Sequence, residues 1–156
     1  MPHKTDTTLT GAAGEHLVLS RLLSKGIVAA QAPEGVRKVD ILVNFLDGGK
    51  PCFIQVKARQ YGAERGWHMG IKHEEMIQDD LFYCFVDLEP EHPTVHVIPS
   101  AVVAKVIKLD HQTWLDTPGK NGQAHNPTTF RRLRENSLGM PENWLDEYLE
   151  RWDLLL

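Results

Sequence analysis

Leucine residues recur at near-helical spacing close to the start of the chain. The segment TLTGAAGEHLVLSRLLSKG, residues 8–26, contains Leu17, Leu19, Leu22 and Leu23 after a start rich in polar and small side chains. Threonines that can cap a helix precede this pattern, and Lys25-Gly26 is a common C-terminal signature. The segment is therefore predicted to form an amphipathic helix.

Apolar runs separated by turn residues follow this helix. The run KVDILVNFL at 38–46 is joined to the run PCFIQVKAR at 51–59 by the turn sequence DGGK. Two such runs around a glycine turn predict an antiparallel hairpin. Further strands are predicted at 81–88 and 94–99, and residues 27–33 are expected to be a short strand or an extended lead.

The remaining segments are predicted to be helices and a loop. KHEEMIQDD at 72–80 predicts a short helix, and SAVVAKVIKL at 100–109 a longer one capped by Ser100. Pro, Gly and Asn indicate a surface loop at 116–127, and TTFRRLRE at 128–135 predicts a short basic helix. A last helix at 142–156 should close the core, against the domain or a second subunit, with one face formed by Trp144, Leu145, Tyr148, Leu149 and Trp152.

This order of elements indicates an α/β protein with a central mixed β-sheet flanked by helices. We expect one domain over residues 1–156, with a core at about 9–108 and a C-terminal loop and α-helical extension at about 109–156. The length and a hydrophobic content of 42% are sufficient to bury a core without disulfides.

Composition narrows the classes of function. A formal net charge of −4 argues against a protein that coats nucleic acid non-specifically, although it leaves room for a local basic face. The eight histidines and two cysteines have no metal-site spacing. No apolar run is long enough to cross a bilayer or to serve as a secretory signal, so we expect a cytoplasmic protein with no membrane partner.

Four polar residues are expected to converge on the predicted hairpin. Gln55 and Lys57 are two positions apart on one strand, so their side chains leave the same face. Asp40 lies near the start of the neighbouring strand, otherwise made of apolar residues. Glu15 follows two glycines that would let the first helix approach the sheet closely. A carboxylate, an amide, an ammonium and a second carboxylate could thus form one site.

The motifs GAAGE, VDILV and IQVKAR, in this order, resemble those of the PD-(D/E)XK nuclease superfamily. In that superfamily a strand aspartate precedes a Glu- or Gln-x-Lys tripeptide on the next strand. A helix glutamate before the aspartate is similar to the arrangement in archaeal Holliday-junction resolvases. The resemblance covers roughly the first sixty residues, and it implies a restriction-endonuclease-like core and DNA as the partner.

The resemblance also implies a role for each residue. Asp40 would be the principal ligand of Mg²⁺ or Mn²⁺, with the Gln55 side chain and the Val56 carbonyl completing the inner shell. Glu15 would hold the metal directly or through water. Lys57 would orient or deprotonate the attacking water and stabilise negative charge. The amide at Gln55 departs from the commoner acid, so metal affinity should be lower.

Other interpretations stay open at the level of the sequence. The four residues could be structural, with Asp40 ending a turn and Lys57 reaching solvent. The chain could also be a nuclease-fold module that binds DNA or a protein without useful catalysis, as the glutamine and the acidic net charge would allow. A third interpretation is an interaction protein that forms a homodimer through its C-terminal aromatic helix.

Basic and aromatic residues near the motifs are weaker candidates for substrate contacts. The rim of a phosphate-facing cleft could be formed by Arg37, Lys38, Arg59, Arg65, Lys72 and the FRRLR run at 130–134. Trp67 with His68 could stack on a base, although packing in the core is favoured for the tryptophan.

Overall fold

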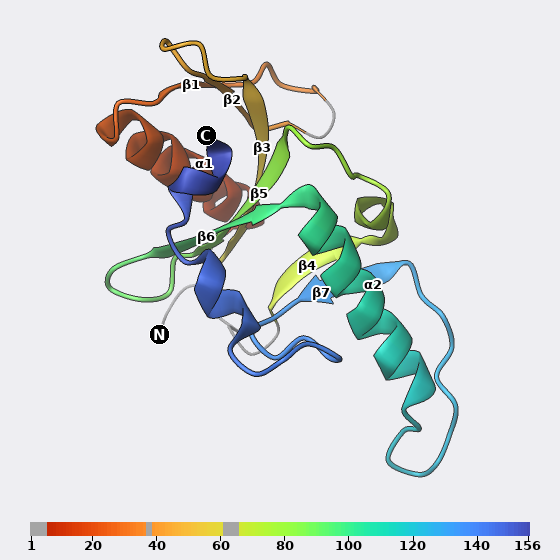
Figure 1. The fold of residues 1–156 in the computed structure, drawn as a ribbon. Helices are drawn as coiled ribbons and strands as arrows, with labels where there is room; N and C mark the ends of the chain where they lie inside the picture. Colours follow the sequence, from red (N-terminus) through yellow and green to blue (C-terminus); the bar gives the residue numbers. More distant parts are fainter. Residues whose placement is uncertain (1–5, 37–38, 61–65) are drawn as a thin grey trace.

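The structure is a computed structural model that describes residues 6–36, 39–60 and 66–156 (Figure 1). A five-stranded sheet forms its centre, in the order β1-β2-β3-β5-β6, and a two-stranded sheet pairs β4 with β7. The strands are β1 Val28–Gln31, β2 Ile41–Asn44, β3 Cys52–Arg59, β4 Trp67–Gly70, β5 Leu81–Asp87, β6 Thr94–Pro99 and β7 Phe130–Leu133. The helices are α1 Thr7–Ser24, α2 Ser100–Asp116 and the short 3-10 helices η2 Ile71–Glu74, η3 Trp144–Tyr148 and η4 Trp152–Leu155.

The central sheet is mixed, which confirms the predicted α/β fold class. β2 pairs antiparallel with β1 and with β3, whereas β3 and β5 are parallel. β6 is antiparallel to β5. The hairpin predicted around DGGK is present, and Gly48 in its turn has a φ of 91°, which side chains other than hydrogen rarely allow.

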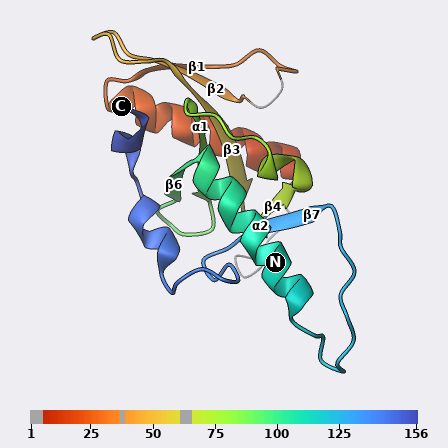
Figure 2. The same ribbon diagram turned by 45° about the vertical axis from the view of Figure 1, so that its right-hand side comes forward.

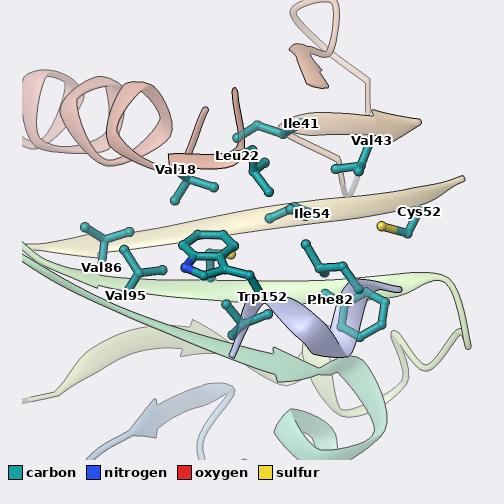
Figure 3. Packing of buried hydrophobic residues seen from close by; sticks show 13 residues of the cluster. Val18, Leu22, Ile41, Val43, Cys52, Ile54, Phe82, Val86, Val95 and Trp152 are labelled. Atoms are coloured by element: carbon teal, nitrogen blue, oxygen red, sulfur yellow. The ribbon is translucent and has the colours of Figure 1, made fainter. Parts of the chain in front are cut away.

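Helix α1 covers one face of the central sheet. Its apolar side packs Val18 and Leu22 on Ile54 of β3, and the ring of Trp152 from η4 lies in the same cluster (Figure 3). The Asp6 carboxylate accepts a hydrogen bond of 2.7 Å from the Thr8 N–H, so an aspartate caps this helix and not one of the predicted threonines.

The opposite face is covered by α2 and by the β4–β7 sheet (Figure 2). Alternate residues of β5 point to the two faces, and all seven are buried, in agreement with the apolar run LFYCFV that precedes Asp87. Ser100 begins α2 but does not cap it, because its hydroxyl bonds both the N–H and the carbonyl of Gln78. None of the helices within the described ranges is both long and apolar enough to cross a membrane.

In the C-terminal third of the chain, two predicted helices are wrong. Residues 130–133 form strand β7, whose alternating burial matches pairing with β4. The predicted helix 142–156 is two separate 3-10 helices, η3 and η4. Glu150 between them has a φ of 52°, a value that cannot continue a helix. The C-terminal extension is therefore not α-helical.

The two tryptophans of this extension are buried, as predicted, but they do not share one face of a helix. Trp144 is 5% exposed and Trp152 is 4% exposed, and they lie in different core clusters on the two faces of the sheet. Leu149, predicted to be on the same buried face, is exposed. Because both tryptophans are buried within the chain, they do not present the dimer surface suggested by the sequence.

The other predicted helix, at 72–80, is reduced to a single turn. Only Ile71–Glu74 is helical, as η2, and residues 75–80 form a non-helical connection to β5. Its Glu74 carboxylate accepts a hydrogen bond of 2.7 Å from Arg131 of β7, so this turn is fastened to the two-stranded sheet.

Candidate functional site

Asp40 lies where the ladder between β2 and β3 ends. The last paired residues are Ile41 and Ile54. Beyond them, the Asp40 N–H donates to the Ile54 carbonyl at 2.9 Å, and the Asp40 Oδ2 accepts from the Val56 N–H at 2.7 Å. The carboxylate thus replaces a backbone acceptor at this point. Its second oxygen, Oδ1, has no hydrogen-bond partner within the described part of the chain.

The backbone of Val56 faces this carboxylate. In an extended strand the N–H and C=O of one residue point to the same side, as the paired bonds of an antiparallel ladder require. The Val56 carbonyl is therefore directed toward the Asp40 side of β3, where β2 no longer pairs with it. One carboxylate oxygen and one carbonyl oxygen share this strand end.

Gln55 and Lys57 leave the face of β3 opposite to α1. Ile54, Val56 and Ala58 pack in the cluster under α1, so the alternating residues project from the other side. The Gln55 Oε1 atom is buried, and among the described residues it has no hydrogen-bond partner. A buried carbonyl oxygen without a partner is rare in folded proteins and calls for a donor, a water or an ion.

Glu15 approaches from α1. The preceding residue, Gly14, is so close to β3 that an added Cβ would lie 2.5 Å from the Ala58 Cβ, which confirms the close approach expected for this glycine. Gly11, the other glycine, has open space around it. The Glu15 carboxylate is 3.5 Å from the Gln31 Nε2 of β1. Burial, and then the charge of Asp40, raise the pKa of Glu15.

The ammonium group of Lys57 is also within the field of Asp40. Burial lowers the pKa of Lys57, the charge of Asp40 opposes that change, and the charge of Lys72 adds to it. Asp40 therefore interacts with Glu15, Val56 and Lys57. The structure thus brings together four of the predicted site residues, Glu15, Asp40, Val56 and Lys57. Gln55 is the neighbour of Val56 on β3.

η2 contributes residues whose role near Lys57 sequence analysis missed. His73 is 1% exposed, and its Nδ1 is 2.7 Å from the hydroxyl of Tyr83. Burial, together with the charges of Lys57 and Lys72, lowers the pKa of His73 to about 4, so the imidazole is neutral at pH 7. No spacing in the sequence indicates this pair, since η2 and β5 meet only in the folded chain.

Among the described residues of the predicted basic rim, Arg59 is buried in the structure and does not face a cleft. Arg59 is 8% exposed, bonds Asp87 and Glu135, and lies over the ring of Trp67 at 3.7 Å. Trp67 is packed in the core, as was favoured. Lys72 is exposed near Lys57. Three further candidates, Arg37, Lys38 and Arg65, lie outside the described residues.

The candidate ligands are of the chemical type that binds a hard divalent cation, but there are few of them. Within residues 6–36, 39–60 and 66–156 there is no group of three His, Cys, Asp or Glu side chains that could hold a metal ion. The set of Glu15, Asp40, Gln55 and Val56 contains only two carboxylates, and its other donors are an amide and a backbone carbonyl. All are oxygen ligands of the kind that Mg²⁺ and Mn²⁺ prefer, and the unpartnered Gln55 Oε1 is one of them.

Comparison with known proteins gives a fold and no family. No protein family and no curated protein matches the sequence. Among solved structures, the chain is similar to a bacterial homing endonuclease, I-Ssp6803I, with a TM-score of 0.57 and 17% identity. The similarity covers 97% of this chain and 91% of that one. The two proteins therefore share an overall fold, including the C-terminal part that the sequence motifs do not cover.

Proposed function

We propose that the chain is a divalent-metal-dependent nuclease of the PD-(D/E)XK type that hydrolyses phosphodiester bonds in DNA. The observation that carries the proposal is the position of Asp40, whose carboxylate bonds the Val56 N–H and whose charge acts on both Glu15 and Lys57. The fold supports it too, because the similar solved structure is that of a homing endonuclease.

Asp40 would hold the cation through Oδ1, assisted by the Val56 carbonyl and the Gln55 amide oxygen, with Glu15 on the far side. A bound Mg²⁺ or Mn²⁺ supplies an activated water at neutral pH and offsets the charge that develops on the phosphoryl oxygens. Burial, and then the negative charge of Asp40, raise the pKa of Glu15, and a cation bound between the two carboxylates would offset both effects.

Lys57 would act on the water and the phosphate. Its lowered pKa makes the neutral amine more accessible than in an exposed lysine, so it is better suited to take a proton from an attacking water. When protonated, the same group would stabilise the negative charge of the transition state. Lys72, which is exposed beside it, adds a second positive charge toward a phosphate.

A second function, DNA binding without cleavage, is favoured by one observation. Gln55 supplies an amide where the resemblance leads one to expect an acid, and this leaves two carboxylates for the cation. A weaker metal site would reduce catalysis without changing the fold. The two functions differ in whether phosphodiester bonds are cut.

The deciding experiment incubates the chain with duplex, branched and single-stranded DNA in Mg²⁺, in Mn²⁺ and in EDTA. Cleavage in either metal that is absent in EDTA is expected, and Lys57→Ala should abolish it while divalent-ion binding, followed by calorimetry, is retained. Lys50→Ala is the matched control, because Lys50 is an exposed lysine in the turn before β3.

Three results contradict the nuclease proposal. Cleavage that persists in Lys57→Ala would exclude this site as its source. The absence of divalent-ion binding, with and without DNA, would exclude the metal-dependent mechanism. Metal and DNA binding without cleavage of any DNA form would favour the binding module.

A further inference from the structure

A pocket lies between α2 and β7, apart from the residues around Asp40. Its volume is about 310 Å³, near the lower end of the roughly 300–1,000 Å³ of small-ligand sites. One wall comes from α2 and the other from β7 and the residues before it. The lining residues are Asp110, His111, Trp114, Thr128, Phe130, Arg131, Arg132 and Arg134.

The α2 wall is a set of stacked rings. Trp114 stacks on His125 with ring centroids 4.0 Å apart and an interplanar angle of 26°. His111, one turn earlier on α2, stacks on Trp114 at 5.7 Å and 28°. Burial is the main cause that lowers the pKa of His111, and a neutral imidazole presents a flat surface without a charge. The stack holds its rings in a defined orientation at the edge of the pocket.

The β7 wall supplies an exposed ring and a cation. Phe130 is 44% exposed, which is unusual for a phenylalanine on a strand. The Arg132 guanidinium lies 5.3 Å from the centroid of its ring, and the ring of His68 from β4 forms a T-shaped pair with it, at a centroid separation of 4.9 Å. Arg132 has no carboxylate partner in the ion pairs of the described residues, in contrast to Arg131 and Arg134.

The floor of the pocket has both a hydrogen-bond acceptor, on Asp110, and a hydrogen-bond donor, on Arg134. Asp110 Oδ1 accepts bonds from Arg134 and from the Leu138 N–H, at 3.0 Å and 2.7 Å. The Arg134 Nε is buried and, within the described residues, has no partner. A carboxylate beside an unused N–H can bond a planar ligand whose edge carries both a donor and an acceptor.

We infer that this pocket binds one unpaired nucleobase of a DNA strand, with Phe130 and the His111–Trp114 rings as its aromatic lining and Arg132 on the adjoining phosphate. Nucleobases have the required flat faces and mixed edges, and aromatic stacking beside arginine is a general way to hold them. A base inside a duplex is covered on both faces, so only an unpaired or extruded base can enter.

This inference rests on the proposed function and narrows its substrate to DNA that contains an unpaired nucleotide. The two sites are joined through η2. Ile71 donates a hydrogen bond of 2.9 Å to the Thr129 carbonyl beside the pocket, and Glu74 pairs with Arg131. The same turn carries Lys72, whose charge acts on Lys57. η2 therefore contacts the residues of the pocket and also places a charge that acts on Lys57.

The test uses the full chain in Ca²⁺ with two DNA duplexes that differ at one position. In one, 2-aminopurine is paired; in the other, it is an unpaired bulge. We expect tighter binding of the bulged duplex, with quenching of 2-aminopurine emission as the base stacks. Phe130→Leu, which keeps an apolar side chain but removes the ring, should weaken binding of the bulged duplex about 5- to 100-fold and leave the paired duplex unchanged.

Matched variants separate stacking from folding and from charge. Phe130→Tyr keeps a ring and should retain the preference for the bulge. Lys105→Gln removes a positive charge from the exposed face of α2 and should leave the preference unchanged, whereas Arg132→Gln should reduce it. Melting temperatures of all variants establish that each is folded.

The outcomes distinguish this inference from the nuclease proposal. Equal binding of both duplexes, an unchanged preference in Phe130→Leu, or no binding of either duplex would overturn the pocket assignment. If Mg²⁺ then still supports Lys57-dependent cleavage, the nuclease proposal stands without the pocket. Quenching and a Phe130-dependent preference without any cleavage would support the pocket and contradict the nuclease.

Discussion

The Asp40 carboxylate accepts a hydrogen bond of 2.7 Å from the backbone N–H of Val56, at the point where β2 stops pairing with β3. A single side chain therefore serves both the strand ladder and the candidate site. The two roles can be separated, because an asparagine keeps an oxygen that can accept the hydrogen bond but carries no charge.

Asp40→Asn should abolish cleavage and divalent-ion binding with little loss of stability. Asp40→Ala should abolish both and also lower the free energy of unfolding by about 1–3 kcal/mol, because the Val56 N–H loses its acceptor. Urea unfolding of the two variants, beside calorimetry with Mn²⁺, measures the difference. Equal stabilities would show that the hydrogen bond contributes nothing.

Gln55→Glu should tighten the binding of Mg²⁺ or Mn²⁺, since it places a negative charge at the buried oxygen that now lacks a partner. Calorimetric titration of the natural chain and the variant tests this. Asn44→Asp, an exposed position on β2, adds the same charge elsewhere and should not change the affinity. If the control tightens binding equally, Gln55 is not a ligand.

Gly14→Ala and Gly11→Ala should have opposite effects although both lie in α1. At Gly14 the new Cβ would be 2.5 Å from the Ala58 Cβ, so the helix must move, at a cost of roughly 1–3 kcal/mol less the gain in helix propensity. At Gly11 nothing lies within 4 Å, and the propensity gain of up to about 1 kcal/mol should appear.

Gly14→Ala should also affect metal binding, because the next residue is the candidate ligand Glu15. Displacement of α1 moves Glu15 away from Asp40, so divalent-ion binding should weaken together with stability. Adding Ala58→Gly, which removes the opposing methyl group, should restore both. A Gly14→Ala chain with natural stability and natural metal affinity would contradict the close packing.

Acidification below pH 6.5 should destabilise the protein through His73. Its pKa is about 4 in the folded chain against an ordinary value of 6.5. Between these values the unfolded chain binds the proton and the folded chain does not, so the stability falls as the pH falls. The penalty is absent above 6.5 and is complete near pH 4, where it is about 3 kcal/mol.

His73→Gln should remove most of this loss. Urea unfolding at pH 7 and at pH 4.5 gives the difference for each chain, and the natural chain should lose more stability than the variant. His16→Gln, on the exposed side of α1, is the control and should retain the natural pH dependence. An identical loss in the natural chain and in His73→Gln would exclude His73 as the cause.

Trp152→Ala should lower the free energy of unfolding by about 3–5 kcal/mol, because the ring is 4% exposed in the cluster beneath α1 and its Nε1 bonds Glu150 at 2.7 Å. Chemical denaturation measures the change. Leu156→Ala, at a position 84% exposed, is the control. A melting curve unchanged by Trp152→Ala would show that the C-terminal segment does not close the core.

The sequence by itself determined the first helix, the β2–β3 hairpin and the buried strands β5 and β6. Their signals are local: leucines at helical spacing, the DGGK turn, and the apolar run LFYCFV. Alternation along β3 also determined that Gln55 and Lys57 share a face. The same local patterns led to errors at 128–135 and 142–156, where both segments have helical periodicity.

Only the tertiary structure determined the conformation of those two segments. Residues 130–133 form a strand because they pair with β4, about sixty residues earlier in the chain. Residues 142–156 form two short helices because η3 and η4 pack against opposite faces of the sheet. The tertiary structure likewise decided that Arg59 is buried in an ion pair, that His73 meets Tyr83, and that α2 and β7 enclose a pocket. Each of these depends on contacts between residues distant in the chain, whose energies no local pattern contains.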